Sequence, residues 1–311
     1  MKVLVTCPPM LGMIESFRHL FEAKDVELTA PEVIQTLSVA ELMVLVPQHD
    51  GWIIGDDPAT REVFAAGKLG KLKAAVKWGI GVDNVDFSAC NDLDIPIVNT
   101  PNMFGAEVAD IAVGYVIGLA RETFEIDRSV RLGAWPKPRG ISLAGKTVAL
   151  IGYGDIGENT AKRLLAANMK VIAYDPATIK SKTAMQTVEF SDWPHRLPEA
   201  DYIVVTCALT SSSHHMINAA TLALAKPGVR IVNVGRGPII DELALIAALQ
   251  SGQVYSAALD VFEVEPLPVD SQMRQHPRCI FGSHNASNTS DAVQRTSEIA
   301  ITKLFSYLGI Q

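Results

Sequence analysis

Short apolar runs alternate with longer stretches of helical periodicity along most of the chain. In the first hundred residues, five such runs have the length of buried strands, each separated from the next by a dozen or more residues: 3–6, 26–29, 52–54, 74–77 and 97–99. Strands joined by crossovers of this length run parallel to one another. The pattern therefore predicts a small doubly wound α/β unit in this part of the chain.

A second series of apolar runs begins at residue 147. Its six members are predicted strands of a second parallel sheet: residues 147–151, 171–174, 202–206, 230–234, 255–259 and 279–282. The last segment, residues 290–308, has apolar side chains at helical spacing. Because the two ends of a domain tend to lie close together, we expect this helix to return to the first domain.

One long helix is predicted between the two series, over residues 106 to about 131. Its apolar side chains occupy more than one side, which is typical of a helix buried between domains or against another subunit. We expect the chain to change domain at about residue 100. The predicted organisation is a discontinuous domain of residues 1–100 and 287–311, with a second domain of residues 101–286 inserted in it.

Composition narrows the class of protein. The 311 residues are 48% hydrophobic and 20% charged, which is ordinary for a globular protein with two cores. The formal net charge of −7 and the lack of a Lys/Arg cluster argue against a nucleic-acid partner. The most apolar segment, residues 111–120, is shorter than the ~20 residues that a membrane-spanning helix needs. We expect no membrane partner.

The cellular compartment is predicted from the N-terminus and the cysteines. The first ten residues read as a β-strand followed by two prolines, without the apolar core of a secretory signal, so we expect a cytoplasmic protein. The four cysteines are far apart and form no C-x-x-C pair, which favours reduced thiols over a disulfide or zinc framework: Cys7, Cys90, Cys207 and Cys279.

The sequence GYGDIG, residues 152–157, is the first candidate binding site. Its glycines Gly152, Gly154 and Gly157 stand between a predicted strand and a helix predicted over residues 158–169. In such a turn the glycines permit the bend, the approach of a pyrophosphate and the packing of helix on strand. The next strand ends at Asp175, where a carboxylate would accept both ribose hydroxyls of an adenosine. A Rossmann dinucleotide site is favoured over a plain turn or a site for S-adenosylmethionine.

A second glycine-rich loop follows the fourth strand of the first domain. It contains Gly79, Ile80 and Gly81, at the carboxyl end of a strand where open α/β sheets bind ligands. Successive backbone N–H groups of such a loop can converge on an anion. An ordinary turn into the next helix is an equally good interpretation of these residues alone.

Three strands of the second series are followed by residues suited to one reaction. Arg236, Glu265 and His284 come after successive predicted strands, so they map to the same sheet edge. Reduction of a 2-oxo acid needs an acid to protonate the new alkoxide, a partner to orient that acid, and a cation to bind the carboxylate and polarise the carbonyl. Histidine exchanges protons near neutral pH, a neighbouring glutamate fixes its tautomer, and arginine is a planar two-pronged donor.

The other histidines do not form a competing site. His214 and His215 are adjacent, so we expect their side chains to diverge, and no third residue has the spacing of a metal ligand. We interpret the remaining four as surface or structural residues: His19, His49, His195 and His276.

The order of these motifs resembles the D-isomer-specific 2-hydroxyacid dehydrogenase family, most closely the catalytic portion of phosphoglycerate dehydrogenases. The resemblance covers nearly the whole chain, from GVDNVD and NTPN through LAGKTVALIGYGDIG to NVGRGPIID, ALDVFEVEP and SHNAS. It implies a Rossmann NAD domain inserted in a flavodoxin-like substrate domain, a cleft that closes on a 2-hydroxy or 2-oxo acid, and a homodimer built on the helix after NTPN.

The resemblance also assigns roles to individual residues. It implies three sets of residues, which are catalytic, NAD-binding and substrate-binding. The catalytic residues are Arg236, Glu265 and His284. The NAD-binding residues are Gly152, Gly154, Asp155, Ile156, Gly157, Asp175, Val234, Gly235 and Asp260, with Asp260 beside the nicotinamide carboxamide. The substrate-binding residues are Lys77, Gly79, Ile80 and Gly81, of which the three loop residues take the substrate carboxylate. No arginine closely follows Asp175, which favours NAD over NADP.

The chain departs from the family pattern at several positions. Ser283 stands before the histidine where the family often has proline, and Gly235 stands before the arginine where it usually has alanine or serine. Lys77 and Trp78 replace an Arg-Ala pair of phosphoglycerate dehydrogenases; Lys77 could still meet a phosphate.

The alternative functions are an NAD(H)-sensing, corepressor-like binding protein and a methyltransferase.

Overall fold

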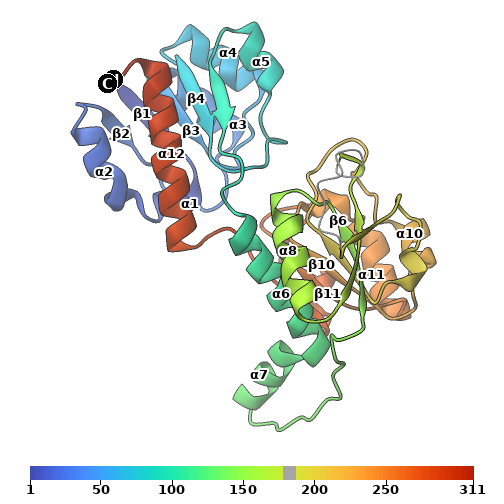
Figure 1. Ribbon diagram of the computed structural model, residues 1–311. Helices are drawn as coiled ribbons and strands as arrows, with labels where there is room; N and C mark the ends of the chain where they lie inside the picture. The colour runs from blue at the N-terminus through green and yellow to red at the C-terminus, as the bar shows by residue number, and fades with distance from the viewer. Residues whose placement is uncertain (178–186) are drawn as a thin grey trace. The chain divides into compact units, whose positions relative to one another are not determined.

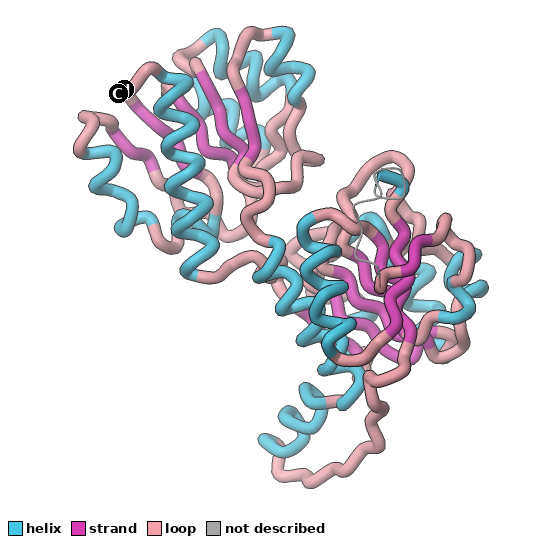
Figure 2. The backbone as a smooth tube through the Cα atoms, viewed as in Figure 1, coloured by secondary structure: helices cyan, strands magenta, loops and turns pink. Residues whose placement is uncertain are grey.

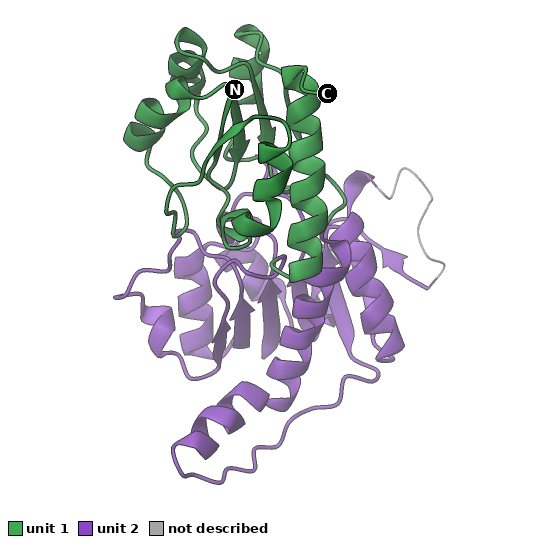
Figure 3. Cartoon of the chain, turned by 90° about the vertical axis from the view of Figure 1, so that its left-hand side faces the viewer, with its two compact units in different colours: residues 1–103, 288–311 green, residues 104–287 purple. Residues whose placement is uncertain are grey.

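The computed structural model describes residues 1–177 and 187–311. Contacts divide this chain into two compact units, shown in separate colours in Figure 3: Met1–Met103 with Asn288–Gln311, and Phe104–Ser287. Each unit is an α/β structure built on one parallel sheet, as predicted, and many of the helices and strands are labelled in Figure 1.

Unit 1 contains a five-stranded parallel sheet of order β2-β1-β3-β4-β5. This is the order of flavodoxin-like sheets. The strands are β1 (Lys2–Val5), β2 (Glu27–Thr29), β3 (Gly51–Ile54), β4 (Ala74–Lys77) and β5 (Ile97–Asn99). The helices are α1 (Pro8–Leu11), α2 (Ile14–Glu22), α3 (Val39–Leu45), α4 (Arg61–Leu69), α5 (Phe87–Asp92) and α12 (Ser290–Leu308), with a short 3₁₀ helix η1 (Val46–Gln48).

Helices cover both faces of this sheet because successive side chains of each strand point to opposite sides. Leu4, Trp52 and Ile54 point into a core closed by α3, α4 and α5. On the other face α12 packs on β3 and β4, and Figure 1 shows it lying along the sheet beside α1. The chain thus returns to this unit at its C-terminal helix, whose bounds match the predicted range.

Unit 2 contains a seven-stranded parallel sheet of order β12-β11-β10-β9-β6-β7-β8. Its strands are β6 (Thr147–Ile151), β7 (Lys170–Tyr174), β8 (Glu189–Phe190), β9 (Tyr202–Val205), β10 (Val229–Asn233), β11 (Val254–Leu259) and β12 (Cys279–Phe281). Its α-helices among the described residues are α6 (Gly105–Arg121), α7 (Thr123–Arg131), α8 (Asp155–Ala166), α10 (Ala219–Leu224) and α11 (Glu242–Ser251). The short 3₁₀ helices in the described part of this unit are η2 (Leu197–Glu199), η3 (Gly237–Ile239) and η4 (Gln272–Gln275).

The strand order of unit 2 is that of a Rossmann sheet with one further strand. From β6 the chain adds strands first on one side of the sheet and then, from β9 onward, on the other. The boundary between β6 and β9 is the switch point where such sheets bind ligands. Six strands were expected, and the structure adds β8, which has only two residues and pairs with β7. A strand of two residues, one of them charged, produces no apolar run that a sequence pattern could reveal.

The single long helix predicted over residues 106–131 is wrong. The chain breaks at Glu122, whose φ of 55° is left-handed, so that α6 ends at Arg121 and α7 begins at Thr123. The break places the ring of Phe124 against Gly118, where a Cβ would lie 2.7 Å from it. Tyr255 holds the corner with a 3.0 Å hydrogen bond from its hydroxyl to Glu122. These tertiary contacts accompany a break at residues 121–123, where the local sequence contains neither glycine nor proline.

In a single chain, this segment is not buried on every side. In α6, Ile111 and Ile117 are 37% and 42% exposed, and α7 has no buried residue. Helix α8 begins three residues before its predicted start, because Gly154 is its N-cap residue. In the part of the chain that the structure describes, no helix has the length and apolar content needed to cross a membrane.

Candidate active site

The three glycines of the turn after β6 have three different structural tasks. Gly152 has a φ of 92°, and a Cβ there would lie 2.6 Å from the Cα of Cys207, so the position requires glycine on both counts. A Cβ at Gly157 would meet the carbonyl oxygen of Gly152, which is the close packing of helix on strand. Gly154 has nothing within 4 Å of such a Cβ. The turn therefore leaves Gly154 open to a ligand.

The first turn of α8 offers backbone donors at this open point. The N–H groups of Asp155 and Ile156 come at the start of the helix, where N–H groups have no intrahelical acceptor and carry the positive end of the helix dipole. The Asp155 side chain lies against Gly105 at the start of α6. The groups suited to a pyrophosphate are thus backbone N–H groups rather than the carboxylate of Asp155.

Asp175 follows β7 and its carboxylate contacts the same turn. Its Oδ2 atom accepts a 2.7 Å hydrogen bond from the N–H of Tyr153, and its Oδ1 atom accepts one of 2.9 Å from Ala177. The carboxylate therefore lies beside the glycine turn, about the place where the ribose of an adenosine is bound in sheets of this type.

Glu265 and His284 form a hydrogen-bonded pair in unit 2. The Nδ1 atom of His284 lies 2.7 Å from Oε2 of Glu265, and the two side chains are 22% and 20% exposed. Glu265 follows β11 and His284 follows β12, so adjacent parallel strands bring both residues to the carboxyl edge of the sheet. The pair fixes the ring orientation through Nδ1, and Nε2 is the ring nitrogen that does not contact Glu265.

Asp260 holds the turn that carries His284. Its carbonyl oxygen accepts the N–H of His284 at 2.7 Å, and its carboxylate accepts the N–H of Ala286 at 2.9 Å. The Tyr115 hydroxyl lies 3.4 Å from the same carboxylate, which is 2% exposed. Burial, together with this carboxylate, raises the pKa of Tyr115. A Cβ at Gly282 would overlap the Asp260 carboxylate, so the turn is closely packed.

Arg236 follows β10 in a turn that Asn233 stabilises. The side chain of Asn233 accepts the N–H of Gly235 at 3.0 Å and donates to the carbonyl of Arg236 at 2.9 Å. Val234 and Gly235 lie inside this turn, and a Cβ at Gly235 would lie 2.8 Å from the carbonyl oxygen of Cys207. Asn233 is 1% exposed, and the sequence analysis did not predict its role. The feature that could have indicated it is a polar residue at the end of an apolar strand.

In unit 1 the loop after β4 presents backbone groups. Gly79 has a φ of 111°, and Thr100 accepts its N–H at 2.8 Å. Asn99 donates a 3.1 Å hydrogen bond to the carbonyl of Ile80. The N–H groups of Ile80 and Gly81 have no acceptor among the described residues. Two neighbouring donors in a fixed loop match what a carboxylate requires.

Lys77 does not lie in the open part of this loop. Its side chain is 2% exposed, and its ammonium donates to the carbonyl of Gly55 at 2.7 Å and to Asp56 at 3.0 Å. Trp78 is 5% exposed and donates from its indole to Ser297 of α12 at 3.1 Å. Both residues are part of the interior of unit 1, where Lys77 is engaged with the loop that follows β3.

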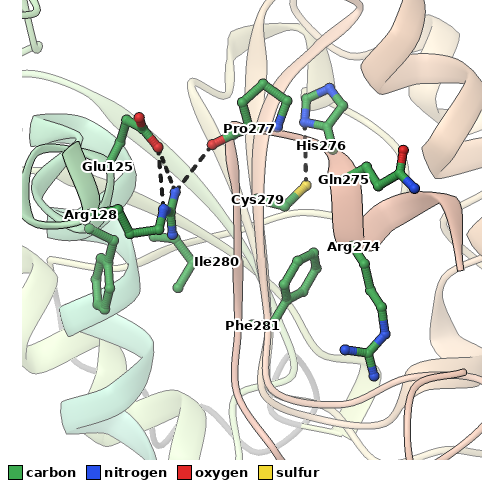
Figure 4. Close-up of a pocket in the computed structure, with 10 residues that line it drawn as sticks. Glu125, Arg128, Arg274, Gln275, His276, Pro277, Cys279, Ile280 and Phe281 are labelled. Carbon is green, nitrogen blue, oxygen red and sulfur yellow. Dashed lines mark hydrogen bonds and ion pairs between the residues drawn. The ribbon is translucent and has the colours of Figure 1, made fainter. Parts of the chain in front are cut away.

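A cavity of about 310 Å³ lies at the other edge of the unit 2 sheet. Figure 4 shows its lining residues, which come from α7 and from the segment around β12. His276 precedes β12, whereas His284 follows it, so the cavity is at the amino end of that strand. Burial, with Arg278 nearby, lowers the pKa of His276, and burial raises the pKa of Cys279 to about 11. None of the sequence-predicted site residues lines this cavity.

The expectation that His214 and His215 diverge is wrong. Their rings stack with centroids 4.1 Å apart and planes inclined by 29°. His215 has a φ of 49°, and this left-handed backbone turns the two side chains to the same side. The ring of His215 lies 2.6 Å from Glu263, a contact that the sequence pattern did not reveal. Of the other histidines, His49 is 4% exposed and bonded through both ring nitrogens to Leu45 and Thr29.

Comparison with known proteins agrees with this arrangement. Residues 113–286 match the family description "D-isomer specific 2-hydroxyacid dehydrogenase, NAD binding domain". A hydroxypyruvate reductase of Thermotoga maritima is 37% identical over 302 residues, which cover 95% of both chains. A D-3-phosphoglycerate dehydrogenase of Methanocaldococcus jannaschii is 33% identical, and the match covers 97% of this chain and 56% of that one. The apo structure of D-lactate dehydrogenase from Escherichia coli matches with a TM-score of 0.82 at 26% identity, covering 100% and 98% of the two chains.

The chain belongs to the D-isomer specific 2-hydroxyacid dehydrogenases. It is an NAD-dependent oxidoreductase that transfers a hydride between nicotinamide and a 2-hydroxy or 2-oxo acid. The comparisons do not favour the alternative of a cofactor-sensing binding protein.

Proposed function

We propose that the chain reduces a small, unphosphorylated 2-oxo acid to the D-2-hydroxy acid, with His284 as proton donor. The observation that supports this most directly is the 2.7 Å pair of Glu265 and His284 on the Rossmann sheet that also carries the glycine turn. Glu265 orients the imidazole and stabilises its charged form, and His284 protonates the alkoxide as hydride arrives. In the reverse direction the same ring accepts the proton.

Arg236 is the cation of the proposed site. Its turn follows β10, next to β11 in the sheet, so it comes from the same edge as Glu265. A guanidinium binds a carboxylate through two parallel hydrogen bonds and stabilises the negative charge that develops on the carbonyl oxygen. The backbone N–H groups of Ile80 and Gly81 are the proposed partners of the substrate carboxylate in unit 1, and this domain is the substrate-binding domain.

The NAD-binding residues follow the strand order of unit 2. The N–H groups of Asp155 and Ile156 receive the pyrophosphate at Gly154, while Gly152 and Gly157 shape the turn. Asp175 binds the adenosine ribose. Val234, Gly235 and Asp260 are proposed to line the nicotinamide end; for Asp260 this is in addition to its contacts with the His284 turn. NAD, when bound, supplies or accepts the hydride.

The loops of unit 1 lack a cation placed to bind a substrate phosphate, and this supports an unphosphorylated substrate. Lys77 is engaged with Asp56 and Gly55 inside the unit. The loops that follow the five strands of this unit contain no other Lys or Arg near their starts, in residues 6–13, 30–37, 55–60, 78–86 and 100–103. A phosphate carries up to two negative charges and is usually bound by such cations. Hydroxypyruvate and glyoxylate need no such partner.

His284→Ala tests the proposed chemistry. We expect turnover with the substrate of the wild-type enzyme to fall by roughly 10²- to 10⁴-fold, because a general acid is lost. Binding of NADH, measured by fluorescence, should remain, since the glycine turn is unchanged. The matched control is His195→Ala, an exposed histidine of the same unit, which should keep full activity. Wild-type turnover by a folded, NADH-binding His284→Ala protein would refute the assignment.

A homodimer in the cytoplasm is the proposed form of the enzyme. Apolar side chains of α6, α7 and the following loop are exposed in a single chain, including Phe124 at 43%, Leu132 at 87% and Trp135 at 78%. A concentration of exposed apolar groups is typical of an interaction surface. The four free cysteines are consistent with a reducing compartment. Light scattering should give twice the chain mass of 33.5 kDa, and Leu132→Asp should shift it toward one chain mass.

A further inference from the structure

His215 makes two hydrogen bonds that reach the segments of two different site residues. Its backbone N–H donates to the carbonyl of Pro238 at 2.8 Å, and its Nε2 atom lies 2.6 Å from Oε1 of Glu263. Pro238 follows Arg236 by two residues, and Glu263 precedes Glu265 by two residues. One histidine from the loop after β9 therefore contacts the turns after β10 and after β11.

The loop of His215 is itself held in place. The side chain of Asn218 donates to the carbonyl of His215 at 2.8 Å. Ile217 pairs with Ile240 in an isolated parallel bridge, with a 3.1 Å hydrogen bond from Ile217 to the carbonyl of Ile239. The contacts of His215 thus start from a fixed backbone, so its ring can fix the position of the segment that it meets.

Glu263 is held from a second side by the start of α11. Its N–H donates to the Glu242 carboxylate at 2.7 Å, while the N–H of Glu242 lies 3.5 Å from the Glu263 carboxylate. Burial, together with the carboxylate of Glu263, raises the pKa of Glu242. A Cβ at Gly237 would overlap the backbone of residues 262 and 263, so the Arg236 turn also packs directly on this segment.

Glu263 anchors the segment of residues 262–265, and this segment ends at Glu265, whose carboxylate contacts His284. The N–H of Phe262 donates to Oε1 of Glu265 at 2.9 Å, which leaves Oε2 on the imidazole at 2.7 Å. A shift of residues 262–265 would therefore move the Glu265 carboxylate relative to the ring. Misplacement by about 1 Å can reduce a catalytic rate by as much as about 10²-fold.

We propose that His215 and Glu263 are positioning residues, which set the placement of Glu265 against His284 and couple it to the turn that carries Arg236. Neither residue is assigned to contact substrate or NAD. The inference rests on the proposed function, because it gives His215 a task only if Glu265 and His284 perform the proton transfer. His214 stacks on the ring of His215 but makes neither of its two hydrogen bonds.

Three variants at this loop separate positioning from general damage. His215→Ala should lower kcat by about 10- to 100-fold, with KM for the 2-oxo acid changed less than kcat and NADH affinity unchanged. His215→Gln should recover most of the loss, since its amide nitrogen can occupy the place of Nε2 and donate to Glu263. His214→Ala is the matched control and should stay within about twofold of the wild type. An equal loss in His214→Ala, or no rescue by glutamine, would overturn the proposal.

A double-mutant cycle tests the route through Glu265. If His215 acts by placing Glu265, adding His215→Ala to Glu265→Gln should cost only a small part of what it costs in the wild type, because interacting residues are not additive. Full additivity of the two losses would overturn the proposal. It would show that His215 acts on activity by some other route.

A readout that needs no turnover distinguishes failure of this inference from failure of the proposed function. The Nδ1 proton of His284 in its 2.7 Å bond to Glu265 should give a downfield proton resonance in the NADH-bound enzyme, assigned by its absence in His284→Ala. We expect this resonance to shift or broaden in His215→Ala and to return in His215→Gln. An unchanged resonance in His215→Ala overturns the positioning role, whereas an inactive wild-type enzyme that shows these changes overturns the proposed function alone.

Discussion

The loop after β4 in unit 1 and the strand ends of unit 2 present different kinds of groups. The loop offers the backbone N–H groups of Ile80 and Gly81, fixed from behind by Thr100 and Asn99. The strand ends offer the side chains of Arg236, Glu265 and His284, of which Glu265 and His284 hold each other. Backbone donors can bind a carboxylate that every 2-oxo acid shares. Side chains can also move a proton and change charge, which the backbone cannot do.

This difference predicts how each region responds to substitution. A single change at Arg236, Glu265 or His284 removes a reacting side chain, so the loss should appear in kcat. In the unit 1 loop only a change of backbone conformation can remove a donor, so the loss should appear in KM. The substitutions that follow test this division.

Among the following substitutions, Arg236→Ala has the largest expected effect. Removal of a donor that stabilises developing negative charge costs about 10²- to 10³-fold in rate. We expect kcat/KM for the 2-oxo acid to fall by this factor in steady-state assays, while NADH affinity is kept. Arg236→Lys should recover little, because a lysine lacks the two-pronged geometry of a guanidinium. Full activity in Arg236→Lys would show that only a positive charge is needed there.

Asp175→Ala should have an intermediate effect on the cofactor. A hydrogen bond to a charged group contributes about 1.5 to 3 kcal/mol, which corresponds to a loss of about 10- to 100-fold in NADH affinity. Discrimination against NADPH should fall at the same time, because the carboxylate no longer repels the additional phosphate. The affinities are measured by fluorescence titration with both cofactors. An unchanged preference for NADH would contradict the role of Asp175.

The smallest expected effect is that of Gly79→Ala in the unit 1 loop. A side chain at a φ of 111° is strained by about 1 to 3 kcal/mol, although the nearest atom to the new Cβ, the Lys77 ammonium, is 3.9 Å away. Relaxation of the loop should raise KM for the 2-oxo acid by about tenfold with little change in kcat. Gly133→Ala is the matched control, because its φ of 85° imposes similar strain outside this loop. A similar rise in KM in the control would disconnect the loop from substrate.

The sequence predicted the parts of the fold and site that follow from parallel strands. Residues after neighbouring parallel strands meet at one sheet edge, so Glu265 and His284 were expected together, and they lie 2.7 Å apart. The glycine turn was recognised because a strand, three glycines and a helix at fixed spacing have few structural alternatives. The C-terminal helix was predicted over the bounds that α12 has, because its apolar side chains keep a regular helical spacing.

The features that the sequence did not predict depend on contacts between distant residues. The break at Glu122 is held by Tyr255, and the pairing of His215 with Glu263 joins residues 48 positions apart. Asn233 and Tyr115 act through buried hydrogen bonds that no periodicity records. The burial of Lys77 was not predicted from the sequence either. A lysine at a strand end is ordinarily solvated, whereas the Lys77 side chain is 2% exposed.

Reduction of an unphosphorylated 2-oxo acid is tested most directly by NADH oxidation with the wild-type enzyme on hydroxypyruvate and on 3-phosphohydroxypyruvate. We expect turnover of hydroxypyruvate with a kcat/KM at least about tenfold higher than for the phosphorylated acid, because each tenfold step needs only about 1.4 kcal/mol of differential interaction. Lys77→Met should leave this ratio unchanged. A preference for the phosphorylated acid that is lost in Lys77→Met would instead show that Lys77 binds a substrate phosphate.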